Sequence, residues 1–197
     1  MRRESHVRFC EGLGGKFPRS TLLVMGFSRR EDAERVLAVL PKRFAKYGLK
    51  LHPEKTRLVR FVRPRKGRPP PGTFDFLGFT HHWGPSRKGK PALKRKTAKS
   101  RLNRTLKGFN EWMRRCRHIP VPAQRQILNG KLWGHYAYFG ITGNSAALWA
   151  VWERVRQLWR KWLSRRSPRG YLSWDTYVSL LERHPLVRPV AMHSTYR

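Results

Sequence analysis

Hydrophobic and polar residues alternate in two different ways along the chain, and this divides it into two parts. In the first part, short apolar runs at 22–27, 56–61 and 74–79 lie between turn-forming residues, a pattern that predicts β-strands. Apolar residues recur at helical spacing between residues 33 and 44, which predicts one helix after the first strand. A hairpin is expected at 83–91, where Gly and Pro interrupt the pattern.

The ends of this helix carry sequence signals. Ser28 and Glu31 have the spacing of a capping box, which predicts a helix start at Ser28. Pro41 has no backbone N–H and is expected to interrupt or kink the helix. Gly48 tolerates the left-handed conformation that follows many helices, so the helix is expected to end there.

From about residue 94 the apolar spacing becomes that of α-helices. Helices are predicted at about 97–117, 123–139, 145–166 and 173–181. The first two have one apolar side. In the third, apolar residues cover about half of the circumference, which indicates a position between two packing partners.

The pattern therefore predicts an α+β protein in four segments. Residues 1–21 are expected to be poorly ordered, 22–92 to form a small mixed piece, 93–184 a helical domain and 185–197 a tail. A length of 197 residues allows one domain or two small ones. Hydrophobic residues make up 39% of the chain, enough to build a core, so complete disorder is not expected.

Charge narrows the partners that the chain can have. Lys and Arg number 44 against 11 Asp and Glu, a formal net charge of +33. Nucleic acid is the usual polyanion for such a chain, bound through phosphate contacts and counterion release. No apolar run approaches the roughly 20 residues that span a bilayer, so no membrane partner is expected. Two isolated cysteines, Cys10 and Cys116, favour a reducing, cytoplasmic setting.

The densest basic stretch runs from Lys94 to Arg117, with ten Lys or Arg against one acid. Ordinary surfaces mix both signs of charge, so contact with RNA phosphates is favoured over a merely solvated helix face. The cations after the third helix also suit the negative end of its dipole. The candidate phosphate-binding residues are Lys94, Arg95, Lys96, Lys99, Arg101, Arg104, Lys107, Arg114, Arg115, Lys131, Arg165, Arg166 and Arg169.

Several residues of the second predicted helix have two interpretations. Gly130 and Gly134 lie on the same side and would let a backbone approach closely, either that of a neighbouring helix or that of RNA. His135 falls on the apolar stripe, where a hydrogen-bonded core histidine is more common than a ligand. Tyr136 and Tyr138 could stack on unpaired bases or pack in the core.

Catalytic and metal sites are not expected. Asn144 suits a turn or the N-cap of the third helix rather than RNA contact. His52, His81 and His82 have no acid or thiol at ligand spacing, so they do not indicate a metal site. We find no Ser, Cys or Lys with the His and Asp partners that would make it a nucleophile.

Four short motifs occur in order along the chain. They are Leu-Lys-Leu-His-Pro-Glu-Lys-Thr at 49–56, Phe-Asp-Phe-Leu-Gly-Phe at 74–79, Gly-His-Tyr-Ala-Tyr-Phe-Gly-Ile-Thr-Gly-Asn at 134–144, and the end at 185–194. Together they resemble the reverse transcriptases encoded by group II introns, over about residues 24–197. The first two resemble palm segments after the catalytic turn and at the primer grip. The third resembles the signature of the thumb, or maturase domain X.

The resemblance implies a specific form of the α+β fold. A partial reverse-transcriptase palm, with few strands plus one helix, would occupy 22–92, and an all-α thumb/maturase helical domain would occupy 93–184. Residues 1–21 resemble nothing in the family. The palm-motif residues implied in this way are Lys55, Thr56, Phe76, Leu77, Gly78 and Phe79. The thumb-signature residues are Gly134, His135, Tyr136, Phe139, Gly143 and Asn144.

One departure from the family pattern removes an expected activity. The family carries an aromatic-Ala-Asp-Asp turn just before the segment that 24–27 resembles, whereas residues 19–23 here hold no carboxylate. Two-metal nucleotidyl transfer needs clustered carboxylates to hold Mg²⁺. We therefore expect no polymerase activity and no cofactor, because Mg²⁺ belongs to the intact members of the family.

The resemblance implies a protein that binds structured intron RNA and helps it fold and splice. Three alternatives stay open. The chain could be a remnant without a role, or the carboxy-terminal half of a split RNA-directed DNA polymerase whose amino-terminal half is separately encoded. It could also be a generic basic DNA-binding protein, since phosphate contacts alone do not read sequence.

Overall fold

The chain forms two compact units, residues 1–95 and 96–197. The computed structural model describes residues 6–11, 22–52, 56–65, 71–86, 88–167 and 169–194, with the backbone alone at 6–11, 22 and 23. In these described residues the first unit combines strands with a helix, and the second is mainly helical. The α+β class predicted from the sequence is thus confirmed.

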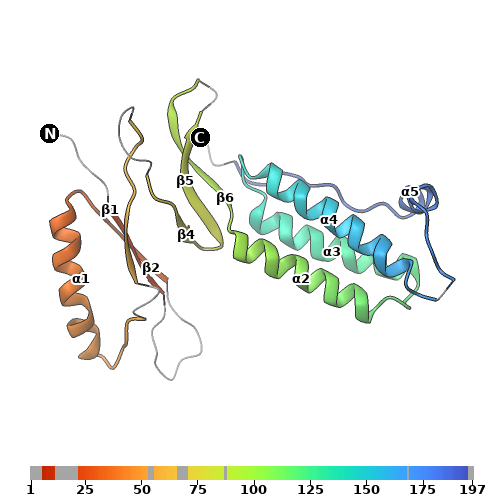
Figure 1. Ribbon diagram of the computed structural model, residues 1–197, viewed down its shortest axis with the longest axis horizontal. Coiled ribbons are helices and arrows are strands. Elements are labelled where there is room, and N and C mark those ends of the chain that lie inside the picture. The colour runs from red at the N-terminus through yellow and green to blue at the C-terminus, as the bar shows by residue number, and fades with distance from the viewer. Residues whose placement is uncertain are drawn as a thin grey trace. The chain divides into compact units, whose positions relative to one another are not determined.

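An antiparallel sheet with strand order β2–β1–β3 lies in the first unit (Figure 1). The central strand β1 (His6–Glu11) pairs with β2 (Leu22–Phe27) on one side and with β3 (Arg57–Arg60) on the other. The first residue of β1 lies opposite the last residue of β2 and the last residue of β3. The strands predicted at 22–27 and 56–61 are therefore confirmed, the second with slightly shorter bounds.

The strand β1 corrects one prediction. Residues 1–21 were expected to be poorly ordered, yet residues 6–11 form the centre of this sheet. His-Val-Arg-Phe-Cys-Glu alternates polar and apolar residues only over its first four positions, and it is short and has charged residues within it, so its pattern predicts no strand. The other residues of this segment lie outside the described part of the chain.

Helix α1 (Arg30–Ala45) follows β2. The N-cap is Arg29, which makes no side-chain cap, so the capping box predicted at Ser28 is wrong. The helix also continues through Pro41 for four more residues, so the proline does not interrupt it. A proline removes one hydrogen bond of the ladder, and here that loss falls in the last turns. Gly48 has a φ of 68°, which confirms the predicted left-handed residue after the helix.

The apolar run at 74–79 is a tight hairpin rather than one strand. β4 (Phe74–Phe76) and β5 (Phe79–Pro85) pair in antiparallel fashion, with Phe76 opposite Phe79. The two residues between them, Leu77 and Gly78, have φ values of 48° and 81°. Two-residue hairpin turns with positive φ at both positions match the twist of the strands they join. The sequence did not suggest this turn because leucine seldom adopts a positive φ.

The chain does not become helical at residue 94. β6 (Pro91–Thr97) is the third strand of the sheet β4–β5–β6, and the first helix of the second half begins only at Lys99. The hairpin predicted at 83–91 is present but longer, because β5 and β6 extend on both sides of its loop. Lys94, Arg95 and Lys96 consequently lie on a strand, which corrects their predicted place at the start of a helix.

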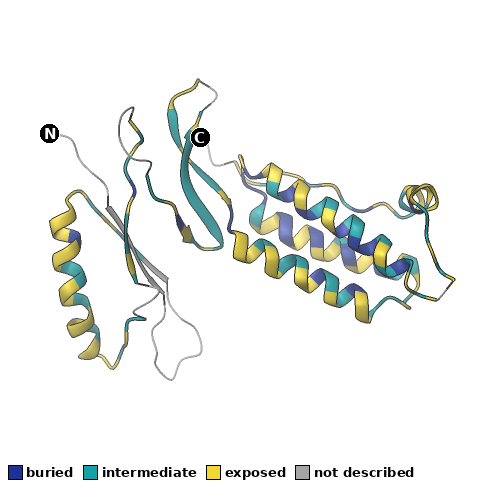
Figure 2. Cartoon of the chain, in the orientation of Figure 1, coloured by how far each residue is buried: buried dark blue, intermediate teal, exposed yellow. Residues whose placement is uncertain are grey.

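The second unit contains α2 (Lys99–Arg115), α3 (Val121–Phe139), α4 (Ser145–Leu163) and α5 (Trp174–Arg183). These confirm the predicted helices within a few residues. Figure 2 shows buried residues along the sides of α2, α3 and α4 that face one another. α4 contacts both α2 and α3, which confirms the position between two partners that its wide apolar face predicted.

A buried glutamine joins three parts of this unit. The side chain of Gln124, on α3, accepts a hydrogen bond from Nε1 of the completely buried Trp159, on α4, at 2.7 Å. Its Nε2 donates to the backbone oxygens of Cys116 and Ile119, both at 2.9 Å. The helix end therefore has its free carbonyls satisfied by a side chain, and α2 is held to the two other helices.

The segment after α5 belongs to the helical unit, which differs from the tail predicted at 185–197. Leu186 is buried in its core, and the Val187 N–H donates to Oδ1 of Asn129 at 2.9 Å. Further on, His193 forms a parallel bridge with Ile141. Hydrogen bonds from the backbone of this segment to Asn129 of α3 and to the loop after α3 hold these residues in place. Their sequence has no periodic pattern that would predict this.

Candidate nucleic-acid interface

The outward side of α2 carries an unbalanced set of cations. Phe109 and Met113 are buried on its inner side, and the opposite side is exposed over its whole length. Of the cations on this side of α2, only Lys107 has a carboxylate partner among the described residues, Glu111 at 3.9 Å, and both side chains are more than half exposed. An exposed pair of this kind contributes little. We call these exposed residues the α2 basic face: Lys99, Arg101, Arg104, Lys107, Arg114 and Arg115.

The remaining cations of the predicted basic stretch lie outside α2, and two of them, Lys94 and Arg95, belong to the first unit. Lys94 and Arg95 are half-buried on β6, and the stem of Lys94 lies against Gly84, where an added Cβ would be 3.0 Å from its Cδ. Lys96 is exposed. The sequence pattern predicted a single basic helix from residue 94 onward. The structure instead places residues 94–96 on β6 and the cations from Lys99 to Arg115 on α2.

The two glycines of α3 face open space. A Cβ added at Gly130 or Gly134 would meet nothing within 4 Å, and both residues are exposed. Of the two interpretations from the sequence, close packing by a neighbouring helix of this chain does not fit the described residues. Trp133 and Tyr138 are also exposed on this helix, and Lys131 lies over the ring of Trp112 at 5.8 Å.

Most thumb-signature residues build the core rather than a surface. Tyr136 is completely buried, its hydroxyl donates to the Val187 backbone oxygen at 3.3 Å, and burial raises its pKa. It is therefore not available to stack on a base, which corrects one of the two roles considered for it. Phe139 is half-buried, and Gly143 has a φ of 89° in the turn before α4.

Asn144 has a structural role that differs from the predicted cap. It occupies the N-cap position of α4 but makes no side-chain cap. Instead its Oδ1 accepts from the Thr97 N–H at 2.9 Å, and its Nδ2 donates to Thr97 Oγ1 at 2.8 Å and to the Phe139 backbone oxygen at 2.9 Å. These hydrogen bonds connect the end of β6 to the end of α3. Because Asn144 is buried, it does not face a ligand.

His135 is a second buried titratable group of α3, next to Tyr136. Its ring lies 4.7 Å from that of Phe139, and Nε2 has no hydrogen-bond partner among the described residues. Burial lowers its pKa below the usual 6.5. The core position favoured from the sequence is thus confirmed, although the expected hydrogen bond is absent at Nε2.

We expect the stability of the helical unit to fall when the pH drops below about 6.5. The folded protein keeps His135 neutral, whereas the unfolded chain binds a proton, so each unit of pKa lowering costs about 1.4 kcal/mol once the pH is below both pKa values. Urea unfolding at neutral and mildly acidic pH measures this loss. His135→Phe should reduce the pH dependence, and His118→Phe, at an exposed position, should leave it unchanged. An unchanged profile in His135→Phe would contradict the assignment.

The cations after α4 divide into exposed and structural groups. Arg165 and Arg169 are exposed, and Arg165 lies over the ring of Trp162 at 5.5 Å. Arg166 is half-buried, donates to the Ile119 backbone oxygen at 2.7 Å, and has its pKa lowered by burial. Its side chain braces the link between α2 and α3, so Arg166 is less available for phosphate than its two neighbours.

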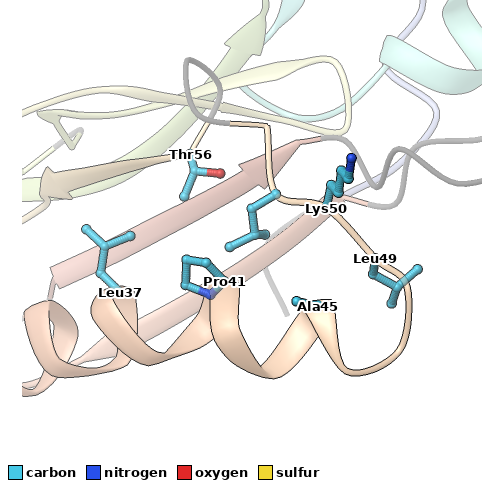
Figure 3. Close-up of a pocket in the computed structure, with 7 residues that line it drawn as sticks. Leu37, Pro41, Ala45, Leu49, Lys50 and Thr56 are labelled. Atoms are coloured by element: carbon cyan, nitrogen blue, oxygen red, sulfur yellow. The ribbon is translucent and has the colours of Figure 1, made fainter.

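The palm-motif residues do not converge on a polar site. Lys55 lies outside the described residues. Thr56 lines an apolar cavity of about 450 Å³ together with Leu37, Pro41 and Ala45 of α1 (Figure 3). The other four, Phe76, Leu77, Gly78 and Phe79, form the β4–β5 turn and its first residues on either side.

Two further features are absent from the residues that the structure describes. His, Cys, Asp and Glu nowhere gather there in a group of three that could hold a metal ion. No helix in that part of the chain is both long and apolar enough to cross a membrane.

One cluster of side chains was not predicted from the sequence. Arg156 and Arg160 of α4 lie against the ring of Trp174, which begins α5. The spacing of Trp152, Arg156 and Arg160 along one side of α4 was a usable signal, but the partner ring comes from a different helix.

No protein-family model matches the sequence, and no curated protein matches it either.

Proposed function

We propose that the chain is an RNA-binding fragment of a group II intron-encoded maturase. In this proposal the first unit is a partial reverse-transcriptase palm without the polymerase carboxylates, and the second is the helical thumb, or maturase domain X. The ligand is structured intron RNA, which the protein helps to fold and splice.

The α2 basic face is the observation that carries this proposal. It presents six cations on one side of a helix, and among the described residues only the weak pair of Lys107 with Glu111 competes for them. Lysines and arginines in such an array contact successive phosphates and fix the orientation of a nucleic acid without reading its sequence. The buried core behind α2 holds these cations on a fixed framework, which favours recognition of a folded RNA by its shape.

The positions of the thumb-signature residues are consistent with the proposal. In this proposal the signature maintains the fold of the domain, because Asn144 at the start of α4 is bonded to the ends of β6 and α3. The exposed cations make the contacts with RNA. The absence of carboxylates at 19–23 removes the Mg²⁺ ligands that a polymerase needs. The proposal therefore separates RNA binding from DNA synthesis.

A splicing assay tests this function. A group II intron RNA is incubated at low Mg²⁺ with and without the chain, and the splicing rate is compared. A faster rate is expected with the chain, because binding of the folded state by the protein favours that state by mass action. An unchanged rate over a range of protein concentrations would remove the maturase proposal.

One structural observation favours a second candidate, the carboxy-terminal half of a split polymerase. In the first unit the described core is small, with Phe61 and Phe74 buried and Val24, Phe76 and Trp83 packed against them. A separately encoded amino-terminal half could complete such a unit. Co-purification with that half, together with primer extension by the pair, would favour this candidate, whereas a soluble chain that melts cooperatively would count against a remnant without a role.

A further inference from the structure

A row of aromatic rings and guanidinium groups lies on the surface of the second unit. It follows α4 and continues through the segment that leads into α5. We call it the arginine–aromatic ladder, and its members are Trp149, Trp152, Arg156, Trp174, Arg160 and Tyr171.

Rings and cations alternate in the ladder from Trp152 to Tyr171. The Cζ atom of Arg160 lies 4.3 Å from the ring centroid of Trp174 and 5.7 Å from that of Tyr171. The Cζ atom of Arg156 lies 5.5 Å from the ring centroids of both Trp152 and Trp174. These distances are within the range of cation–π contacts, so each guanidinium contacts two aromatic rings.

Hydrogen bonds around Leu172 hold the end of the ladder in place. The Leu172 N–H donates to Ser164 Oγ at 3.2 Å, and its backbone oxygen accepts from Arg160 Nε at 3.1 Å. Arg160 Nη2 also donates to the Tyr171 hydroxyl at 3.3 Å. Ser173 then caps α5 by accepting from the Thr176 N–H. The ring of Tyr171 is therefore positioned by the backbone on one side and by Arg160 on the other.

Packing within the protein does not account for the outer rings. Tyr171 is 79% exposed, and Trp149 at the other end is 46% exposed. An exposed aromatic ring with a fixed orientation gives little to the core, but it offers a flat surface to a partner. Arg156 has a carboxylate partner, since Glu153 Oε1 lies 3.0 Å from its Nη2. Arg160 has no carboxylate partner among the described residues.

We propose that this ladder binds unpaired nucleotides of RNA by stacking their bases on Tyr171 and Trp149. Exposed aromatic rings and guanidinium planes are the groups on which splayed-out bases stack, and the same arginines attract the adjacent phosphates. The proposal rests on the proposed function for the class of ligand. It adds a second contact, made by α4 and the segment before α5 instead of α2, and directed to single strands instead of folded helices.

Binding of the full chain to three probes tests the ladder. The probes are an unstructured oligoadenylate of about ten nucleotides, a blunt RNA duplex of about 16 base pairs and inorganic polyphosphate. Tyr171→Ala should weaken oligoadenylate binding by about fivefold or more, the loss of one base–ring stack. It should change binding of the duplex and of polyphosphate by less than about twofold, because the loss of a neutral ring leaves the phosphate contacts unchanged.

Matched variants separate stacking from other effects. Tyr171→Phe loses the hydrogen bond from Arg160 but keeps the ring and its contact with the guanidinium, so it should retain most of the oligoadenylate binding that Tyr171→Ala loses. Tyr47→Ala removes a tyrosine that is 73% exposed in the first unit and should have no effect. Trp149→Ala provides a second, independent removal of a ring, and thermal melting of each variant checks its fold.

The possible outcomes distinguish the two proposals. Oligoadenylate binding that is unchanged in both Tyr171→Ala and Trp149→Ala would overturn the ladder proposal, as would an equal loss for polyphosphate. An unmodified chain that binds the duplex but not oligoadenylate would also overturn it, while the proposed function would stand. An unmodified chain that binds neither RNA would remove the proposed function and the ladder together.

Discussion

Replacing four arginines of the α2 basic face with glutamine is expected to lower the affinity for folded intron RNA by about a hundredfold or more at about 0.1 M salt. The variant is Arg101→Gln, Arg104→Gln, Arg114→Gln and Arg115→Gln, all at exposed positions without a carboxylate partner among the described residues. Each lost phosphate contact also lowers the slope of log affinity against log salt concentration by about 0.7–0.9. A salt titration of RNA binding measures both quantities.

A matched variant separates a specific face from net charge. Arg35, Lys42, Arg43 and Lys46 are also exposed and lie on or just after α1 in the first unit. Glutamine at these four positions removes the same charge from a total of +33. It should change RNA affinity much less than the α2 variant does. An equal loss in the two variants would show that binding depends on the charge of the whole chain, and the α2 basic face would lose its role.

The helical unit could be predicted from the sequence because each helix repeats its apolar residues at the helical period. The apolar stripe of α2 is an example, and two of its residues, Phe109 and Met113, are buried. The strands at 22–27 and 57–60 were predictable for a similar reason, since turn-forming residues bound them. Such patterns involve only residues that are close in the sequence, so a single sequence is enough to predict the element.

The errors occur where tertiary contacts override the local pattern. Lys94, Arg95 and Lys96 continue the composition of the helix that follows, yet pairing with β5 makes this segment a strand. The hairpin at Leu77 and Gly78 was missed because only the fold shows that a leucine adopts a positive φ. Strand propensity depends on cross-strand neighbours and burial, and these are not visible in a sequence.

The candidate site could be predicted only in part. Charged residues are mostly exposed, so the cations of α2 could be expected on the surface from their spacing alone. The sequence left both packing and base stacking open for Tyr136 and Tyr138, and the structure buries the first and exposes the second. The contact of Arg160 with Trp174 joins two helices across a loop, and nothing in the local pattern indicates which ring meets which cation.

Asn144→Ala is expected to lower the free energy of unfolding of the helical unit by about 3 kcal/mol. The substitution leaves the buried Thr97 N–H without its acceptor and removes the bonds from Asn144 Nδ2 to Thr97 Oγ1 and to the Phe139 backbone oxygen. A buried donor left without a partner costs about 1–3 kcal/mol, and each further bond contributes about 1 kcal/mol. For a unit of about 100 residues, the melting temperature should fall by more than about 10 °C.

Two further variants identify the cause of this loss. Thr97→Val removes only the hydroxyl partner, so it should cost about 1 kcal/mol. Asn103→Ala replaces an exposed asparagine of α2 and should change stability by less than about 0.5 kcal/mol. Below its melting temperature, Asn144→Ala should bind folded RNA like the unmodified chain, because the side chain is buried. Full stability combined with weakened RNA binding would instead place Asn144 in the RNA interface and reverse its structural assignment.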